Sequence, residues 1–247
     1  MKPQIIIREC TTLDELAECV ALQRAVFDLP EIEISPVRHF VVTKNAGGFV
    51  LGAFAADELV GFVLSVPAFL RGEKAFYSHM TAVRGDFQSY GIGGRLKWAQ
   101  RDRALNENVQ FIKWTFEPVK ARNAFFNLEK LGAIVNEFQE NFYGVDYSTS
   151  ADRKIGLASD RLFAEWDLRS EKVRRLADGE LYTEESSVAK RIVIPGNWND
   201  LVEADPNKAL EEQLRIRCEF QDAFGGGLIG RGFVRDGDAP AYLLYER

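Results

Sequence analysis

Cysteine is scarce in this chain of 247 residues, which contains only Cys10, Cys19 and Cys218. An odd number of cysteines at these spacings fits neither a disulfide framework nor a zinc site. We therefore expect buried free thiols in a reducing compartment, and no metal. Long apolar runs are also missing, since none approaches the roughly 20 residues of a membrane-spanning helix. The apolar run near Met1 is too short for a signal peptide, so we expect a cytoplasmic protein with no membrane partner.

An excess of positive charge is missing too. The chain carries 31 lysines and arginines against 37 acidic residues, which gives a net charge of −6, and the two signs are interleaved. Proteins that coat nucleic acid are usually basic, so no nucleic-acid partner is expected. The length suits one large domain, or a domain of ordinary size with a substantial extension.

Helix and strand signals follow one another in a definite order in the first half. A short β-branched strand at 5–7 precedes a helix that begins after Thr12, which forms a predicted capping box with Glu15. A second short helix follows Pro36. Three strands in hairpin order are then expected to pair antiparallel, at 49–55, 59–69 and 75–83. The remaining predicted elements are a helix to about 107, a strand at 110–116, a helix at 121–131 and strands within 133–143.

The pattern changes after about residue 150. The predicted elements there are a strand at 161–168, a polar exposed segment at 169–185, a short strand at 191–195, a helix at 208–224 and a hairpin of 228–234 with 242–245. Three glycines at 225–227 follow a helix and precede a strand, which indicates a helix stop and not a phosphate loop. No linker rich in Pro, Gly or Ser separates the halves. We therefore expect a domain at 1–147 and an α/β extension at 148–247 packed on it.

A glycine-rich segment joins the strand that ends at Val83 to the following helix. It reads Val83-Arg84-Gly85-Asp86-Phe87-Gln88-Ser89-Tyr90-Gly91-Ile92-Gly93-Gly94-Arg95. Glycines let backbone N–H groups approach a ligand closely, and the first N–H groups of a helix attract anions. The segment can therefore hold a pyrophosphate, flanked by two arginines. A Rossmann site fits less well, because Leu96 replaces a glycine and antiparallel strands come first. A glycine cap without any ligand is the other alternative.

Gln88, Gly91 and Gly93 form a Gln-x-x-Gly-x-Gly sequence after a strand. This sequence resembles the coenzyme A pyrophosphate motif of the GCN5-related N-acetyltransferase (GNAT) superfamily, and the order of elements over residues 4–146 resembles that fold. Segments such as Ser78-His79-Met80 and Ser159-Asp160-Arg161 resemble a group of longer bacterial GNAT proteins, some of them linked to N-succinylation of amino acids. The resemblance implies an α/β (α+β) fold with a mixed, mostly antiparallel sheet flanked by helices. It implies acetyl-CoA or another acyl-CoA as cosubstrate, bound by Val83, Arg84, Gln88, Ser89, Tyr90, Gly91, Ile92, Gly93, Gly94 and Arg95.

Acyl transfer from a thioester to an amine needs a base and donors for the oxyanion. The resemblance places the acyl group beside the strand that contains His79, whose pKa suits a general base near neutral pH. Tyr77 faces the same side of the strand, and it stands where some relatives carry a catalytic glutamate. These two residues are the catalytic candidates. The alternative is that His79 is a hydrogen-bonded sheet residue without a chemical role, and His39 is predicted to be structural.

Two positions depart from the family pattern. Leu128 stands where many GNAT enzymes carry a tyrosine that protonates the leaving thiolate, and Ala121 stands where an asparagine often binds coenzyme A. Asn123 and Asn127, four residues apart on one predicted helix face, are candidates for cofactor binding, with capping or surface roles as the alternative. The substrate candidates are Trp114, Glu117, Asp160 and Arg161, with core packing or a structural ion pair as their alternatives.

The sequence therefore predicts an acyl-CoA-dependent N-acyltransferase, acetyl or succinyl, acting on a small-molecule amine such as an amino acid. The alternative is a non-catalytic acyl-CoA-binding or sensing protein. Leu128 favours the alternative, whereas His79 and the complete glycine motif favour the enzyme. Homo-oligomerisation is left open.

Overall fold

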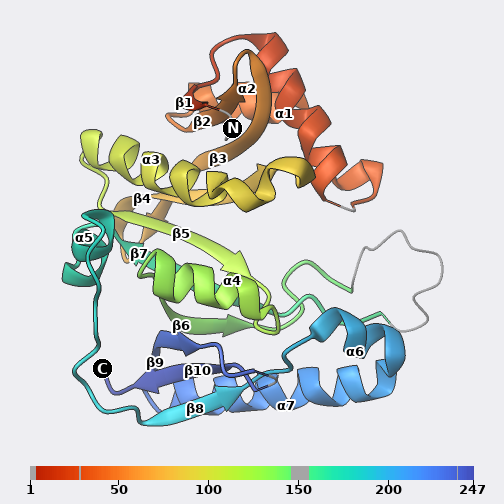
Figure 1. The fold of residues 1–247 in the computed structure, drawn as a ribbon, viewed down its shortest axis with the longest axis vertical. Helices are drawn as coiled ribbons and strands as arrows, with labels where there is room; N and C mark the ends of the chain where they lie inside the picture. Colours follow the sequence, from red (N-terminus) through yellow and green to blue (C-terminus); the bar gives the residue numbers. More distant parts are fainter. Residues whose placement is uncertain (1–3, 28, 146–155, 238) are drawn as a thin grey trace. The chain divides into compact units, whose positions relative to one another are not determined.

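The chain divides into two compact units in a computed structural model that describes residues 4–27, 29–145, 156–237 and 239–247 (Figure 1). The first unit ends at Lys113 and the second begins at Trp114. The predicted domain boundary between 147 and 148 falls within 146–155, outside the described residues, so it stays a prediction. No helix in the described ranges is long and apolar enough to cross a membrane.

The first unit has its elements in the predicted order. They are β1 (Ile5–Glu9), α1 (Leu13–Val26), the 3₁₀ turn η1 (Glu31–Glu33), α2 (Val37–Asn45), β2 (Phe49–Ala55), β3 (Glu58–Leu70), β4 (Glu73–Val83), the 3₁₀ segment η2 (Gly85–Tyr90), α3 (Ile92–Asn106) and the first half of β5 (Phe111–Phe116). The predicted capping box is confirmed, because Thr12 Oγ1 accepts from the Glu15 N–H at 3.2 Å and the Glu15 carboxylate accepts from the Thr12 N–H at 3.1 Å.

The sheet of the first unit lies between two layers of helices. Strands β1 to β4 are antiparallel neighbours, and β5 joins β4 in parallel, with Ala75–Tyr77 opposite Phe111–Lys113. Side chains alternate between the faces of a strand. Phe62 of β3 packs with Phe40 of α2 and with α1 in one core cluster, whereas Ser65 of β3 bonds to α3. The helices α1 and α2 therefore cover one face of the sheet, and α3 covers the other.

The β3–β4 ladder contains an irregularity at His79. Leu64 lies opposite Met80 and the next residue, Ser65, lies opposite Ser78, so that His79 is an extra residue in β4. Such a β-bulge leaves one residue outside the ladder and re-aims its side chain.

The second unit contains the remaining described residues. Its elements are the second half of β5, α4 (Ala121–Phe125) continued by the π-helical segment η3 (Phe126–Lys130), β6 (Ile134–Gln139), β7 (Arg161–Asp167), α5 (Glu171–Ala177), β8 (Lys190–Val193), α6 (Trp198–Ala204), α7 (Pro206–Gly225), β9 (Ile229–Val234) and β10 (Ala241–Tyr245). The predicted hairpin of β9 and β10 and the helix stop after Gly225 are confirmed. The polar segment 169–185 does contain a helix, α5, and α6 was not predicted. Both have seven residues, too few to show a helical period.

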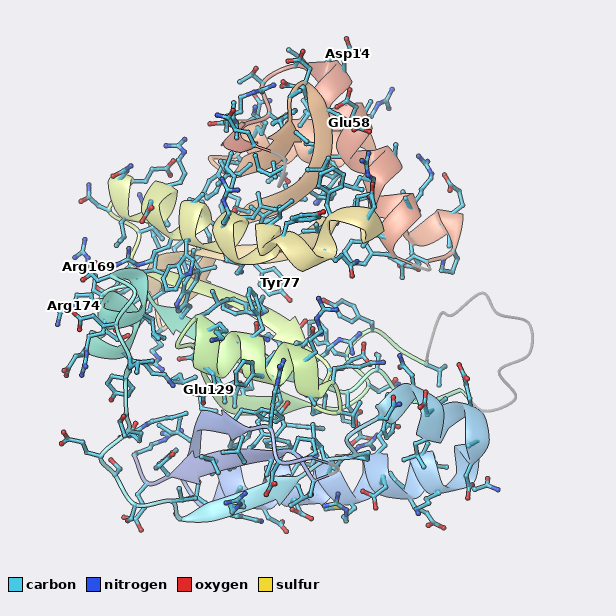
Figure 2. All side chains as sticks on the ribbon, viewed as in Figure 1. Asp14, Glu58, Tyr77, Glu129, Arg169 and Arg174 are labelled. Atoms are coloured by element: carbon cyan, nitrogen blue, oxygen red, sulfur yellow. The ribbon has the colours of Figure 1, made fainter. Side chains whose placement is uncertain are left out.

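The C-terminal segment packs directly on residues 114–139. The strands run in the order β7-β6-β9-β10-β8, and β9 meets β6 where Val135 lies opposite Gly230. A Cβ on Gly230 would lie 2.5 Å from a Val135 methyl group, so only glycine permits this approach. The buried Tyr242 hydroxyl donates to the Pro118 carbonyl oxygen at 2.8 Å. Glu129, labelled in Figure 2, accepts a hydrogen bond at 2.7 Å from the backbone N–H of Phe233.

Candidate functional site

The start of α3 has the features of an anion site. Gly91 precedes the helix with a φ of 72°, in the left-handed region that favours glycine. None of the described side chains caps the helix, and the Arg95 N–H bonds to the Gly91 carbonyl oxygen across the opening turn at 3.1 Å. The N–H groups before Arg95 are those that a helix leaves without internal partners. A Cβ on Gly93 would meet only a Val83 methyl group at 3.9 Å, so protein packing does not require glycine there, whereas close approach by a ligand would.

Side chains of the preceding loop hold its shape. Gln88 donates to the Val83 carbonyl oxygen at 3.2 Å and so closes the loop onto the end of β4. Arg84 is bound by Asp86 at 2.7 Å and by Glu58, which Figure 2 labels, and its guanidinium lies 4.7 Å from the centre of the Phe87 ring. With two carboxylates against it, Arg84 brings little net positive charge to the loop.

The other predicted cofactor residues differ in their surroundings. Arg95 donates to the Ile5 carbonyl oxygen at 2.7 Å, a bond that ties α3 to β1. Ile92 is fully buried and anchors the helix in the core, whereas Tyr90 is exposed. The side chain of Ser89 lies outside the described part of the chain. The backbone at the start of α3 is therefore the strongest candidate for phosphate binding, and the side-chain roles stay predictions.

His79 does not stand alone in the bulge of β4. The ring of His39, from α2, lies against it with the ring centroids 5.6 Å apart and the planes at 62°. His79 is exposed enough for a substrate to reach it, but partial burial, and then the charge of His39, lower the pKa of its imidazole below 6.5. An imidazole with a lowered pKa is uncharged at neutral pH and can accept a proton. The sequence alone does not indicate this pair, because 40 positions separate the two residues and only their shared residue type links them.

A buried polar cluster lies behind the bulge, on the α3 side. Lys97 Nζ donates to Ser78 Oγ at 2.9 Å, and Gln100 Nε2 donates to Ser65 Oγ at 2.7 Å. The two serines are cross-strand neighbours, and all four side chains are buried. One helix thus holds both strands at the point where their register shifts, next to His79. This cluster, also missed from the sequence, joins the helix that begins at the glycine motif to the strand that carries the proposed base.

Replacing Lys97 with Met should stabilise the protein below neutral pH. Burial lowers the pKa of Lys97 to about 7. In the unfolded chain the same lysine has a pKa near 10.5. Between pH 7 and pH 10.5 the unfolded chain therefore binds more protons than the folded protein, and the parent gains stability as the pH rises through this range. Below pH 7 the buried ammonium costs about 5 kcal/mol, at about 1.4 kcal/mol per pKa unit. Loss of the polar contacts of Lys97, the bond to Ser78 among them, costs about 1–3 kcal/mol.

Urea unfolding at pH 6 should therefore show Lys97→Met a few kcal/mol more stable than the parent, with less pH dependence between 7 and 10. Lys74→Met, at an exposed position of β4, makes the same replacement without burial, so it is the control and should change little. Destabilisation of Lys97→Met at pH 6 would show that the ammonium is compensated in the fold.

Residues of the second unit that were predicted to bind ligands have internal partners. Trp114 Nε1 donates to Asn127 Oδ1 at 3.3 Å, and both side chains are buried. Asn123 is exposed instead, because the helix becomes π-helical at Phe126 and residues four apart no longer share a face. Leu128 is fully buried. The helix predicted at 121–131 ends before Gly132, which has a φ of 75°.

The acidic and basic candidates of the second unit form ion pairs. The buried Asp160 receives two hydrogen bonds of 3.0 Å from Arg217, a partner that the sequence did not suggest. Arg161 lies 3.8 Å from Glu117 and 5.2 Å from the centre of the Tyr143 ring. For Asp160 the structure thus shows the ion pair that we gave as the alternative to substrate binding. The substrate roles of Glu117 and Arg161 stay predictions. Nowhere in the four described ranges do three or more His, Cys, Asp or Glu side chains gather so as to hold a metal.

Comparison with known proteins relates this fold to solved structures only. No protein-family model matches the sequence, and no curated protein matches it. The structure is similar to a protein from Desulfovibrio desulfuricans assigned to the GNAT family of acetyltransferases, with 13% identity, a TM-score of 0.55, and 67% of this chain and 99% of that chain covered. It is similar to the ribosomal-protein-S18-alanine N-acetyltransferase of Escherichia coli, with 14% identity, a TM-score of 0.52, and 74% and 99% covered.

A third similar structure comes from Salmonella typhimurium and was solved with its cofactor acetyl-CoA. Its identity is 15%, its TM-score is 0.54, and 68% of this chain and 96% of that chain are covered. In all three comparisons the neighbour is matched over almost its whole length, whereas between a quarter and a third of this chain is left over. The predicted α+β architecture, with its mostly antiparallel sheet between helices, is confirmed. The chain therefore has the fold of the GNAT-family acetyltransferases.

Proposed function

We propose that this protein is an acyl-CoA-dependent N-acyltransferase that moves an acetyl, succinyl or similar acyl group to the amine of a small molecule. The observation that supports this most is the start of α3, with Gly91 and Gly93 and with no cap among the described side chains. It follows, after the 3₁₀ segment η2, the strand whose bulge displays His79. Phosphate oxygens suit such a helix start because its N–H groups and its dipole both attract anions. Neighbours of the same fold include an N-acetyltransferase and a protein solved with acetyl-CoA.

Each chemical requirement of the transfer has a candidate in the first unit. Within this unit the parallel pairing of β4 with β5 ends at Tyr77 and Lys113, so Ser78–Val83 presents backbone N–H and C=O groups at an edge. Such groups can hydrogen-bond an extended chain like pantetheine and the thioester oxygen. The thioester supplies the acyl group. His79 accepts the proton of the attacking amine, the new C–N bond forms and the C–S bond breaks. The thiolate can leave unassisted, because thiols have a pKa of roughly 8.5.

Substitution of Gly93 should abolish most of the cofactor binding. Gly93→Glu puts a carboxylate where we place phosphate and blocks the approach to the backbone. Loss of two charge-assisted hydrogen bonds, at about 1.5–3 kcal/mol each, would weaken acetyl-CoA binding at least about 100-fold. Titration calorimetry measures this directly. Gly85→Glu is the matched control, because it adds the same charge to the same loop outside the helix start, where a Cβ meets nothing within 4 Å. Equal affinities for the parent and Gly93→Glu would mean that the site lies elsewhere.

An assay of coenzyme A release separates catalysis from sensing. The buried Leu128, which cannot donate a proton, is the observation that favours a protein that only binds acyl-CoA. Acetyl-CoA and succinyl-CoA would each be incubated with a panel of amines that includes amino acids. We expect amine-dependent release of free coenzyme A with at least one pair. Tight binding without release for every pair would instead support the sensing function.

A further inference from the structure

The two histidines of the chain, His39 and His79, form a pair that the proposed reaction does not by itself require. His39 lies on α2 and His79 in the bulge of β4, so the contact exists only because α2 packs on the face of the sheet opposite α3. His39 also meets Phe40 edge-on, with the ring centroids 6.3 Å apart. We propose that His39 is a positioning residue for acyl transfer, which holds the His79 ring in place and keeps it uncharged. This inference rests on the proposed function.

The ring of His39 is partly buried beside His79. Its Nε2 atom is buried and, within the described residues, has no hydrogen-bond partner. The contact with His79 is therefore one between the two rings, whose planes meet at 62°.

His39 also acts on the charge of His79. Burial, and then the charge of His39, lower the pKa of His79, and within the described residues no further charge contributes to this shift. The elements around the ring agree with this. The facing residues of β3 at the bulge, Leu64 and Ser65, do not titrate, and Tyr77 is the nearest titratable residue on β4 itself. On α2 the neighbouring charged residue, Arg38, is exposed.

Two ionisable rings in contact titrate as a pair, so that protonation of one opposes protonation of the other. At neutral pH His79 would accordingly stay uncharged and ready to take the amine proton. A substrate ammonium that enters the site then meets no positive charge on His79. The α2 helix thereby acts on the reaction without touching the thioester.

The test uses nuclear magnetic resonance, because a chain with two histidines gives only two imidazole signals to follow. Both titrations would be recorded in the full-length parent, in His39→Phe and in Arg38→Gln, with His79→Gln to assign the signals. His39→Phe keeps an aromatic ring and removes the charge. If His39→Phe does not fold, His39→Gln takes its place in the experiment. We expect the pKa of His79 to rise in the His39 variants, because the repulsion is gone, and to stay close to the parent value in Arg38→Gln.

The same variants are then compared in the coenzyme A release assay. The acidic limb of the pH–rate profile should move to higher pH in the His39 variants by the amount seen in the titration. An unchanged His79 titration in them would overturn the proposal. A shifted titration with an unmoved limb would also overturn it, since the pair would then have no part in the transfer. A shifted titration without coenzyme A release from any amine would leave the pair in place and count against the proposed function alone.

Discussion

A fragment that ends at Gly144 is expected to be insoluble or largely unfolded. The cut removes β7, which pairs with β6 from Ile134 to Gln139, and it removes Trp166, whose indole N–H donates to the Leu131 carbonyl oxygen at 2.7 Å. The large side chains that are lost from this core include Leu162, Trp166, Phe220 and Tyr242, all fully buried. At about 1.5–3 kcal/mol for each buried side chain, the loss is on the order of 10 kcal/mol. That equals the whole stability of a typical domain.

This result would support our proposal that residues 148–247 belong to the acyltransferase unit and are not a tethered module. Expression of fragments 1–144 and 1–245, followed by sedimentation and thermal unfolding, gives the measurement. The longer fragment lacks only Glu246 and Arg247, both exposed, and should behave like the parent. A soluble fragment 1–144 with a cooperative unfolding transition would show that the N-terminal part folds alone and would contradict the proposal.

His79→Gln should lower kcat by roughly 10²- to 10⁴-fold, the usual contribution of a general base. Glutamine keeps a similar size and can still hydrogen-bond, but it cannot accept a proton near pH 7. Affinity for acetyl-CoA should be preserved, because the phosphate site that we propose at the start of α3 lies beyond the end of β4. Steady-state kinetics and calorimetry on the same preparation check both parts.

The pH dependence gives a second, independent measure of His79. A base must be uncharged to work, so activity should fall as the pH drops through the pKa of His79, and burial together with His39 places that fall below pH 6.5. The limb should vanish in His79→Gln, while Lys74→Gln, an exposed position on the same strand, should keep it. If His79→Gln turns over within about threefold of the parent, well short of the range for a general base, then His79 is structural. Tyr77 or a bound water would then be the next candidate for the base.

Local interactions let the sequence alone predict most of the first unit. The capping box of Thr12 and Glu15, the antiparallel run of β2 to β4 and the glycine motif at 88–93 all depend on residues close together in the chain. Helix caps, hairpin order and a positive φ each depend on only a few neighbouring residues, so the types of those residues predict them. The fold class followed from the order of these elements, which the structure reproduces.

Contacts between distant residues decided the rest, and no local pattern encodes them. His39 meets His79 across 40 positions, Lys97 reaches Ser78 across 19, and Arg217 reaches Asp160 across 57. Burial itself is such a property: the low pKa of Lys97 exists only because α3 covers that face of the sheet. The extra residue at His79 likewise arises from how β3 and β4 pair, since the register between two strands belongs to neither strand alone. The sequence by itself thus determined which residue types are present for phosphate binding and proton transfer. Only the tertiary structure, through packing and desolvation, decided which of them meet and which are charged.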